Sequence, residues 1–182
     1  MASLIVVCTG NICRSPVGEG VLRHFLAGTV EVTSAGTHAM SGHPAAPEAI
    51  EFVGRTIEQD LDHTARQLTR DQSESADLVI AMTAEHRAWI ARSAPRAVRR
   101  TFTLKELDQL LGMLPADASF ATLKELTLAV SRLRPRLAAT ATYLDIADPY
   151  GGPPEGYESS FGEVLDSSRR VAEAITNRLR SA

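Results

Sequence analysis

The stretch Leu4-Ile5-Val6-Val7-Cys8-Thr9-Gly10-Asn11-Ile12-Cys13-Arg14-Ser15-Pro16 says most about how this chain folds. Its first four residues are apolar and predict a short buried strand. Ser15 is a good helix N-cap and Pro16 suits the first helical position, so we expect a helix to begin there. The residues between strand and helix form a tight loop that contains a glycine. The stretch therefore predicts a strand, a loop and a helix N-terminus in succession.

A cysteine and an arginine bracket this loop, with five residues between them. Inward-pointing backbone N–H groups, with the partial positive charge of a helix N-terminus, form a seat for a tetrahedral oxyanion. The same dipoles and the guanidinium of Arg14 favour the thiolate form of Cys8, which is the nucleophilic form. Arg14 can also hold two phosphate oxygens with its planar fork. The alternative, a buried cysteine beside a surface arginine, is disfavoured by the flanking strand and helix start.

Length and composition narrow the class of protein. The 182 residues predict one domain, residues 1–182, with a sizeable core. A net charge of −3 gives no basic field, so we expect neither nucleic acid nor a membrane as partner. Both cysteines lie in the loop, which argues against a disulfide scaffold or thiolate zinc site, and we expect no metal and no cofactor. Without an apolar run of transmembrane length or a signal sequence, the expected location is cytoplasmic.

Apolar periodicity along the rest of the chain alternates between strand and helix patterns. A helical stretch in the middle of the chain is expected to break near Pro135. Thr103 and Glu106 have the spacing of a capping box. The expected strands cover residues 30–34, 77–82 and 99–102, and the expected helices begin near Pro16, Glu48, Thr83, Thr103, Leu123 and Phe161.

This alternation predicts an α/β fold, a three-layer sandwich with a central four-stranded parallel sheet flanked by helices. An extra helical insertion is expected at about 112–146. In parallel sheets of this kind, ligands bind at the carboxyl ends of the strands, which is where the loop after Cys8 falls.

Several segments, in the same order along the chain, resemble the low-molecular-weight protein tyrosine phosphatases. Residues 8–16 look like the phosphate loop of that family, and Asp148-Pro149-Tyr150 looks like its general-acid loop. The other similar segments are Ser34-Ala35-Gly36-Thr37, His63-Thr64-Ala65-Arg66-Gln67-Leu68 and Asp77-Leu78-Val79-Ile80-Ala81-Met82. The resemblance covers residues 1 to about 111 and about 146 to 182.

The resemblance implies roles for individual residues. Cys8 would be the nucleophile, Arg14 would bind phosphate, and Asp148 would protonate the leaving phenolate and then assist water. Met40 and Tyr150 would line the substrate cleft, although Met40 stands where relatives often carry an aromatic residue. The loop residues that would bind phosphate are Thr9, Gly10, Asn11, Ile12, Cys13, Arg14 and Ser15, and those that would hold the loop from behind are Ser34 and His63.

The resulting functional prediction is hydrolysis of phosphotyrosine and aryl phosphate monoesters through a phosphocysteine on Cys8. The expected partners are phosphotyrosine proteins, and the resemblance to the family implies a tyrosine kinase as one of them. The expected oligomeric state is a monomer or weak dimer. One alternative is a phosphopeptide-binding pseudophosphatase that lacks turnover. Another is a thioredoxin-coupled arsenate reductase, which needs cysteines outside the loop. Cys13 could form a reversible disulfide with oxidised Cys8 or serve as a small buried side chain.

Overall fold

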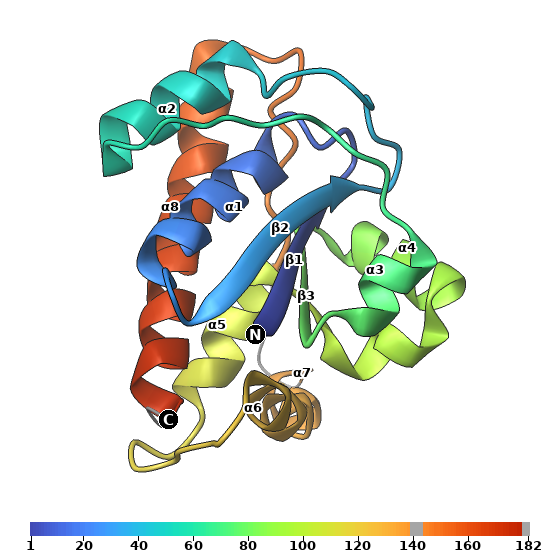
Figure 1. Ribbon diagram of the computed structural model, residues 1–182, viewed down its shortest axis with the longest axis vertical. Coiled ribbons are helices and arrows are strands. Elements are labelled where there is room, and N and C mark those ends of the chain that lie inside the picture. The colour runs from blue at the N-terminus through green and yellow to red at the C-terminus, as the bar shows by residue number, and fades with distance from the viewer. Residues whose placement is uncertain (139–143, 180–182) are drawn as a thin grey trace.

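The protein has a parallel sheet between two layers of helices (Figure 1). The computed structural model describes residues 1–138 and 144–179, so part of the expected 112–146 insertion lies outside the described residues. All strand pairings are parallel, in the order β2-β1-β3-β4. The strands are β1 (Ala2–Cys8), β2 (Val30–Gly36), β3 (Leu78–Ala81) and β4 (Thr101–Thr103).

Helices cover both faces of the sheet because successive side chains of a strand point to opposite sides. Leu4 and Val6 of β1 lie in the larger core cluster, whereas Ile5 and Val7 lie in a second cluster on the opposite face. This arrangement confirms the expected three-layer α/β fold. The first face carries α1 (Arg14–Phe25), α2 (Pro47–Ile57), α5 (Leu104–Gly112) and α8 (Pro154–Arg178), and the second carries α3 (Arg70–Ser75), α4 (Ala84–Ser93) and the 3-10 helix η1 (Pro95–Arg100).

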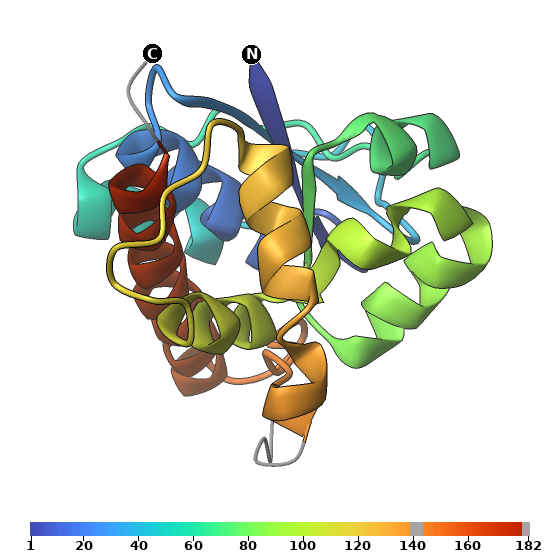
Figure 2. The same ribbon diagram turned by 90° about the horizontal axis from the view of Figure 1, so that it is seen from below.

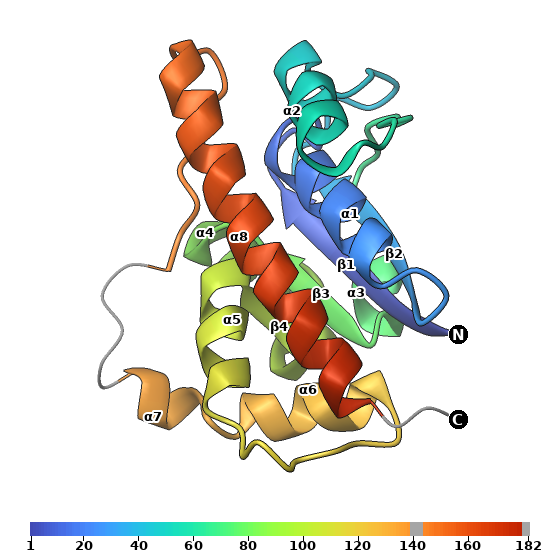
Figure 3. The same cartoon turned by 90° about the vertical axis from the view of Figure 1, so that its left-hand side faces the viewer.

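The middle segment of the chain adds α6 (Leu123–Ser131) and α7 (Arg134–Ala138). Figures 2 and 3 show α6 at the end of the sheet where the strands begin, away from the loop that follows β1. The helical stretch breaks at residues 132–133, near Pro135 as expected, and Pro135 itself lies in the first turn of α7. Proline is tolerated there because its missing N–H has no partner in the first helical turn.

Two element boundaries differ from those expected from the sequence. Arg99 and Arg100 belong to η1, so the last strand starts only at Thr101. The C-terminal helix begins at Pro154, seven residues before Phe161, with a proline in its first turn. Its first two turns contain only Tyr157 and polar or small residues before Phe161, so apolar periodicity could not reveal them.

The start of α1 also differs from the expectation. The helix begins at Arg14 and its N-cap is Cys13, which makes no side-chain capping bond. Ser15 is therefore not the N-cap: it lies inside the first turn with its hydroxyl 2.9 Å from the sulfur of Cys8. A bond to the thiol replaces the capping bond that the sequence pattern predicted.

Candidate active site

The loop between β1 and α1, residues 8–15, turns its carbonyl groups outward. Each of five successive carbonyl oxygens accepts a hydrogen bond from outside the loop, whereas the backbone N–H groups of residues 10–13 donate to no residue in the described part of the chain. Since N–H and C=O point in opposite directions within a peptide unit, this leaves the amides free for an oxyanion. The outer contacts are Thr37 N to Cys8 O (2.9 Å), His38 N to Thr9 O (3.0 Å), Met40 N to Gly10 O (2.9 Å), His63 Nε2 to Asn11 O (2.8 Å) and Ala46 N to Ile12 O (2.7 Å).

Two residues allow the backbone to follow this path. Asn11 has φ of 56°, in the left-handed region that asparagine tolerates better than most residues. Gly36, which is paired with Cys8 at the end of β2, lies so close to Thr9 that a Cβ atom would overlap the Thr9 carbonyl oxygen. Glycine at that position lets the segment after β2 pack directly against the loop.

The thiol of Cys8 lies at the carboxyl end of β1, and the residue is 2% exposed. Its sulfur contacts the hydroxyl of Ser15, which is also 2.9 Å from Nδ2 of Asn11. Asn11 Nδ2 is in turn 2.8 Å from the hydroxyl of Ser34 on β2. His63 donates to the carbonyl oxygen of Asn11, so Ser34 and His63 both hold the loop through Asn11.

Arg14 and Asp148, which are 134 positions apart in the sequence, form an ion pair with Arg14 Nη2 2.5 Å from Asp148 Oδ2. Arg14 Nη1 donates to the carbonyl oxygen of Ile146 at 3.0 Å. Arg14 Nε is buried and has no hydrogen-bond partner among the described residues. The fork therefore holds the 146–148 segment beside the loop, and an oxyanion that binds Arg14 has to compete with Asp148.

Met40 and Tyr150 occupy different positions relative to this loop. A Cβ atom on Gly10 would lie 3.5 Å from Ile12 Cγ1 and 3.8 Å from Met40 Cγ, so these two apolar side chains lie next to Gly10, one from the loop itself and one from the segment after β2. Met40 is 36% exposed. Tyr150 is 62% exposed, and its backbone N–H donates to Asp148 Oδ1 at 3.3 Å. Its backbone thus helps to orient the carboxylate, while its ring projects toward solvent.

Cys13 is held as a neutral thiol. Burial, reinforced by the charge of Cys8, raises its pKa to about 12, and the side chain lies in the larger core cluster. A protonated thiol attacks an oxidised sulfur slowly, because the thiolate is the reactive form. The contacts therefore favour a packing role, and a disulfide with Cys8 stays a prediction.

His86 is a site residue that the sequence analysis missed. Its ring is buried on α4, with Nε2 2.9 Å from Thr9 Oγ1 and Nδ1 2.9 Å from Thr83 Oγ1. Burial, followed by the positive charge of Arg14, lowers its pKa to about 4. His86, Thr9, Arg14 and residues 145–148 line one cavity of about 230 Å³. A larger cavity of about 690 Å³ lies at the opposite end of the sheet and contains none of these groups.

The depressed pKa of His86 predicts a loss of stability toward acidic pH. Between about pH 6.5 and 4 the unfolded chain binds a proton at His86 that the folded chain does not. The stability that neutral His86 contributes is therefore complete above about pH 6.5 and is lost as the pH falls toward 4. Compared with His86→Gln, the native chain should lose about 3 kcal/mol more of its unfolding free energy across this window. Urea unfolding at a series of pH values measures the difference, with exposed His24→Gln as control. Equal pH profiles for the native and His86→Gln proteins would contradict the prediction.

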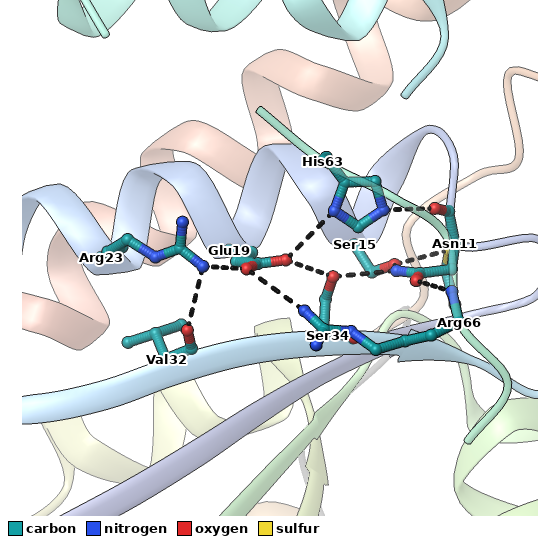
Figure 4. Close-up of polar contacts among 9 residues, drawn as sticks. Asn11, Ser15, Glu19, Arg23, Val32, Ser34, His63 and Arg66 are labelled. Atoms are coloured by element: carbon teal, nitrogen blue, oxygen red, sulfur yellow. Dashed lines mark hydrogen bonds and ion pairs between the residues drawn. The ribbon is translucent and has the colours of Figure 1, made fainter. Parts of the chain in front are cut away.

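Glu19 of α1 is a second residue that the sequence analysis missed. It is buried and receives hydrogen bonds from the Ser34 hydroxyl and from Arg23, as Figure 4 shows. His63 Nδ1 lies 3.4 Å from the same carboxylate. The only indication of this role in the sequence was its position four residues after Ser15, which places the two side chains on the same face of α1.

Neither a metal site nor a membrane-spanning helix is found among the described residues. No cluster of three or more His, Cys, Asp or Glu side chains there is arranged to hold a metal ion. Within residues 1–138 and 144–179, no helix combines the length and apolar character needed to cross a membrane.

The sequence is similar to several known phosphatases. Residues 3–115 match the family described as low molecular weight phosphotyrosine protein phosphatase, a match that ends before Asp148. The probable low molecular weight protein-tyrosine-phosphatase EpsP of Ralstonia nicotianae is 39% identical and aligns over 98% of this chain and 97% of its own. The protein-tyrosine-phosphatase Etp of Escherichia coli K12 is 42% identical over 99 residues, and the alignment spans only 66% of that protein.

Solved structures extend the similarity over nearly the whole chain. The arginine phosphatase YwlE of Geobacillus stearothermophilus superimposes with a TM-score of 0.72 at 30% identity, covering 97% of this chain and 94% of that one. The tyrosine phosphatase Wzb of Escherichia coli K30 superimposes with a TM-score of 0.69 at 28% identity, covering 94% and 96%. The structural neighbours thus include phosphatases with two different substrates.

Proposed function

This chain belongs to the low molecular weight phosphotyrosine protein phosphatase family, and from that premise we propose that it hydrolyses phosphotyrosine in proteins and aryl phosphates. One observation carries the proposal. The Cys8 thiol lies in a loop in which five successive carbonyl groups are bonded on the outside, so the amides of residues 10–13, which have no partner among the described residues, remain to hold a phosphate. Arg14 contributes a cation to the same loop, with one buried N–H that still lacks a partner among the described residues.

In the first chemical step the Cys8 thiolate attacks phosphorus. A sulfur–phosphorus bond forms as the bond to the phenolic oxygen breaks, and Asp148 transfers its proton to that oxygen. The loop amides and Arg14 hold the phosphoryl oxygens as charge shifts between them. Asp148 is an ion-paired carboxylate in the free protein, so phosphate binding to Arg14 would release it to take up a proton from solvent, and this is the proton that it passes to the leaving oxygen.

In the second step water attacks the phosphocysteine. The Asp148 carboxylate removes a proton from the water, a new phosphorus–oxygen bond forms, and the sulfur leaves as a thiolate. The hydroxyl of Ser15, 2.9 Å from the sulfur, donates a hydrogen bond that stabilises this thiolate. The products are inorganic phosphate and the thiolate enzyme, and Asp148 keeps the proton taken from water until phosphate leaves and its carboxylate pairs with Arg14 again.

The choice between tyrosine and arginine as the phosphorylated residue depends on the walls of the loop. Met40 lies beside the loop at Gly10, and its exposed side chain offers apolar surface suited to the face of an aromatic ring. The relative named as an arginine phosphatase favours phosphoarginine as a second candidate. Release of phosphate from matched phosphotyrosine and phosphoarginine peptides tests the choice, with Cys8→Ser as blank. We expect faster turnover of phosphotyrosine, and turnover of phosphoarginine alone would overturn the assignment.

The remaining expectations concern alternatives and partners. Measurable turnover would exclude a pseudophosphatase, and the lack of cysteines outside the loop disfavours an arsenate reductase. We propose phosphotyrosine proteins, a tyrosine kinase among them, as substrates, and a monomer or weak dimer as the working form. Both thiols are free, and a thiolate nucleophile suits a reducing compartment such as the cytoplasm.

Asp148→Asn is expected to slow reactions with poor leaving groups most, because only these need a proton in the transition state. Hydrolysis of phenyl phosphate should fall about a hundredfold or more, while p-nitrophenyl phosphate, whose leaving group is more acidic, should lose far less. Steady-state kcat for the two esters, measured on native and variant protein, gives the comparison. An equal loss on both esters would mean that Asp148 shapes the loop and does not donate the proton.

A further inference from the structure

Arginine side chains are concentrated in two short parts of this chain. Of its 19 lysine and arginine residues, five arginines lie in residues 87–100 and three in residues 132–136, and neither range contains an acidic residue. The first range covers most of α4 and all of η1, and the second covers the end of α6 and the start of α7. Figure 2 shows the yellow-green helices α4 and η1 next to the orange helices α6 and α7. A chain with a net charge of −3 therefore carries a locally basic surface.

Arg134 fixes α7 against this surface. Its Nη1 donates to the carbonyl oxygen of Val98 on η1 at 3.3 Å, and its Nε donates to Glu106 at 3.0 Å. Its guanidinium carbon lies 4.1 Å from the centre of the Phe102 ring of β4, which is a cation–π contact. The helix that follows α6 is thus held beside η1 by contacts of one side chain with three elements.

A groove lies where α4, η1 and α7 meet. It has a volume of about 320 Å³ and is lined by Ala84, Arg87, Ala88, Ala91, Val98 and Arg134. The four α4 residues are spaced three or four positions apart, so they share one face of that helix. The groove therefore combines an apolar lining with guanidinium groups from two different helices.

The charge around this groove is positive. Buried Glu106 accepts from both Arg87, at 2.8 Å, and Arg134, so one carboxylate lies between two guanidinium groups. The Arg87 side chain is still 41% exposed and can reach a ligand. Five further arginines on the bordering segments are exposed and have no ion-pair partner among the described residues. These are Arg92, Arg96, Arg99, Arg132 and Arg136.

The groove lies next to the catalytic cavity. Ala84 lines the groove, whereas Thr83, Glu85 and His86 line the cavity that also contains Arg14 and Asp148. The first turn of α4 is all that separates the two. From Ala84 to Ala91 the helix rises about 10 Å, the length of about three extended residues. A peptide whose phosphotyrosine occupies the phosphate loop would thus reach the groove with residues only a few positions away.

We propose that this groove binds acidic residues on one side of the phosphotyrosine, so that the preferred substrates are phosphotyrosines in acidic segments of proteins. The inference rests on the proposed function and narrows its substrate class. The opening beside the catalytic cavity favours a substrate peptide over other anionic partners. Aliphatic side chains and no aromatic ring line the groove among the described residues, so it offers no platform for stacking bases, and a concave surface does not suit a bilayer.

The test compares kcat/KM for two phosphotyrosine peptides of equal length. One carries three glutamates on each side of the phosphotyrosine, and the other carries glutamines at the same positions. We expect the acidic peptide to be hydrolysed with about tenfold higher kcat/KM, the effect of two or three partly exposed ion pairs. Raising NaCl from about 0.05 to about 0.5 M should remove most of this preference. Equal kcat/KM for the two peptides at low salt would overturn the proposal.

Variants of exposed residues locate the preference on this surface. The triple variant Arg92→Gln, Arg99→Gln, Arg136→Gln removes one unpaired cation from each of α4, η1 and α7 and should hydrolyse both peptides about equally. Its kcat/KM for p-nitrophenyl phosphate should stay native, because that ester has no flanking residues. The matched control neutralises three arginines on other helices, by Arg55→Gln, Arg169→Gln and Arg170→Gln, and should keep the preference. A triple variant that still prefers the acidic peptide as strongly as the native protein would overturn the proposal.

A substitution inside the groove tests charge separately from bulk. Ala88→Glu places a carboxylate among the arginines and should abolish the preference, whereas Ala88→Gln adds the same bulk without charge and should keep it. An equal loss of preference in both variants would overturn recognition by charge.

These results are distinguishable from a failure of the proposed function. No turnover of either peptide would refute the proposed function, while turnover without a preference would refute this inference alone. The native protein and the triple variant are also mixed with phosphatidylserine vesicles and with an RNA oligonucleotide. If only the native protein bound one of these and the two peptides were hydrolysed equally, the arginines would serve another kind of partner and the proposal would be overturned.

Discussion

Cys8→Ser should abolish hydrolysis of aryl phosphates while the fold remains intact. A serine hydroxyl is almost entirely protonated at neutral pH and does not replace a thiolate as nucleophile, so kcat should fall at least about a thousandfold. The substitution exchanges one buried atom for a smaller one, and the contact with Ser15 can persist as a hydroxyl–hydroxyl bond. The assay is release of p-nitrophenol, with circular dichroism and urea unfolding to verify folding.

A separate measurement makes this result specific to the nucleophile. The loop amides and Arg14 are unchanged in Cys8→Ser, so phosphate or vanadate should still bind and raise the unfolding midpoint. Cys13→Ser serves as the matched control, because it alters the other loop thiol, which is buried and neutral. If folded Cys8→Ser kept more than a few per cent of native turnover, Cys8 could not be the nucleophile.

Arg14→Lys should be nearly as damaging. The native guanidinium makes two directed contacts with residues 146–148 and keeps a third buried N–H without a partner among the described residues. An ammonium group carries the same charge but cannot reproduce this planar fork. We expect kcat/KM to fall about a thousandfold, or about 4 kcal/mol of transition-state stabilisation.

Arg55→Lys provides the control for Arg14→Lys. Arg55 pairs with Glu158 on the surface at 2.6 Å, both side chains are more than half exposed, and the change should leave kcat/KM at the native value. Phosphate inhibition constants would show whether the loss in Arg14→Lys comes from binding, from the chemical step or from both. Near-native kcat and KM in Arg14→Lys would rule out bidentate binding of phosphate by this residue.

Much of the fold followed from local patterns. The strands expected at 30–34 and 77–82 lie within one or two residues of β2 and β3, and the capping box at Thr103 is present as predicted. The predicted boundaries were wrong where a contact in the folded protein replaced the local preference of a residue. Ser15 has the chemistry of an N-cap, but its hydroxyl is used by Cys8 and Asn11, contacts that only the folded loop provides.

The sequence by itself determined the reactive unit, because its parts are contiguous. Cys8, Arg14 and the residues between them make a strand, a turn and a helix start within eight positions, so spacing alone predicts an oxyanion seat. The parallel order of strands and helices placed that seat at the carboxyl end of the sheet. The resemblance to a known family added Asp148, which spacing could not have linked to the loop.

Only the tertiary structure decided what surrounds that unit. The carbonyl groups of the loop are held by the segment after β2 and by His63, and the charge behind it comes from Glu19, which no sequence motif distinguishes from a solvated helix residue. His86 reaches Thr9 across 77 positions. The physical reason is that hydrogen bonds and burial depend on which distant segments pack together, whereas the strand, the turn and the helix start depend on neighbouring residues alone.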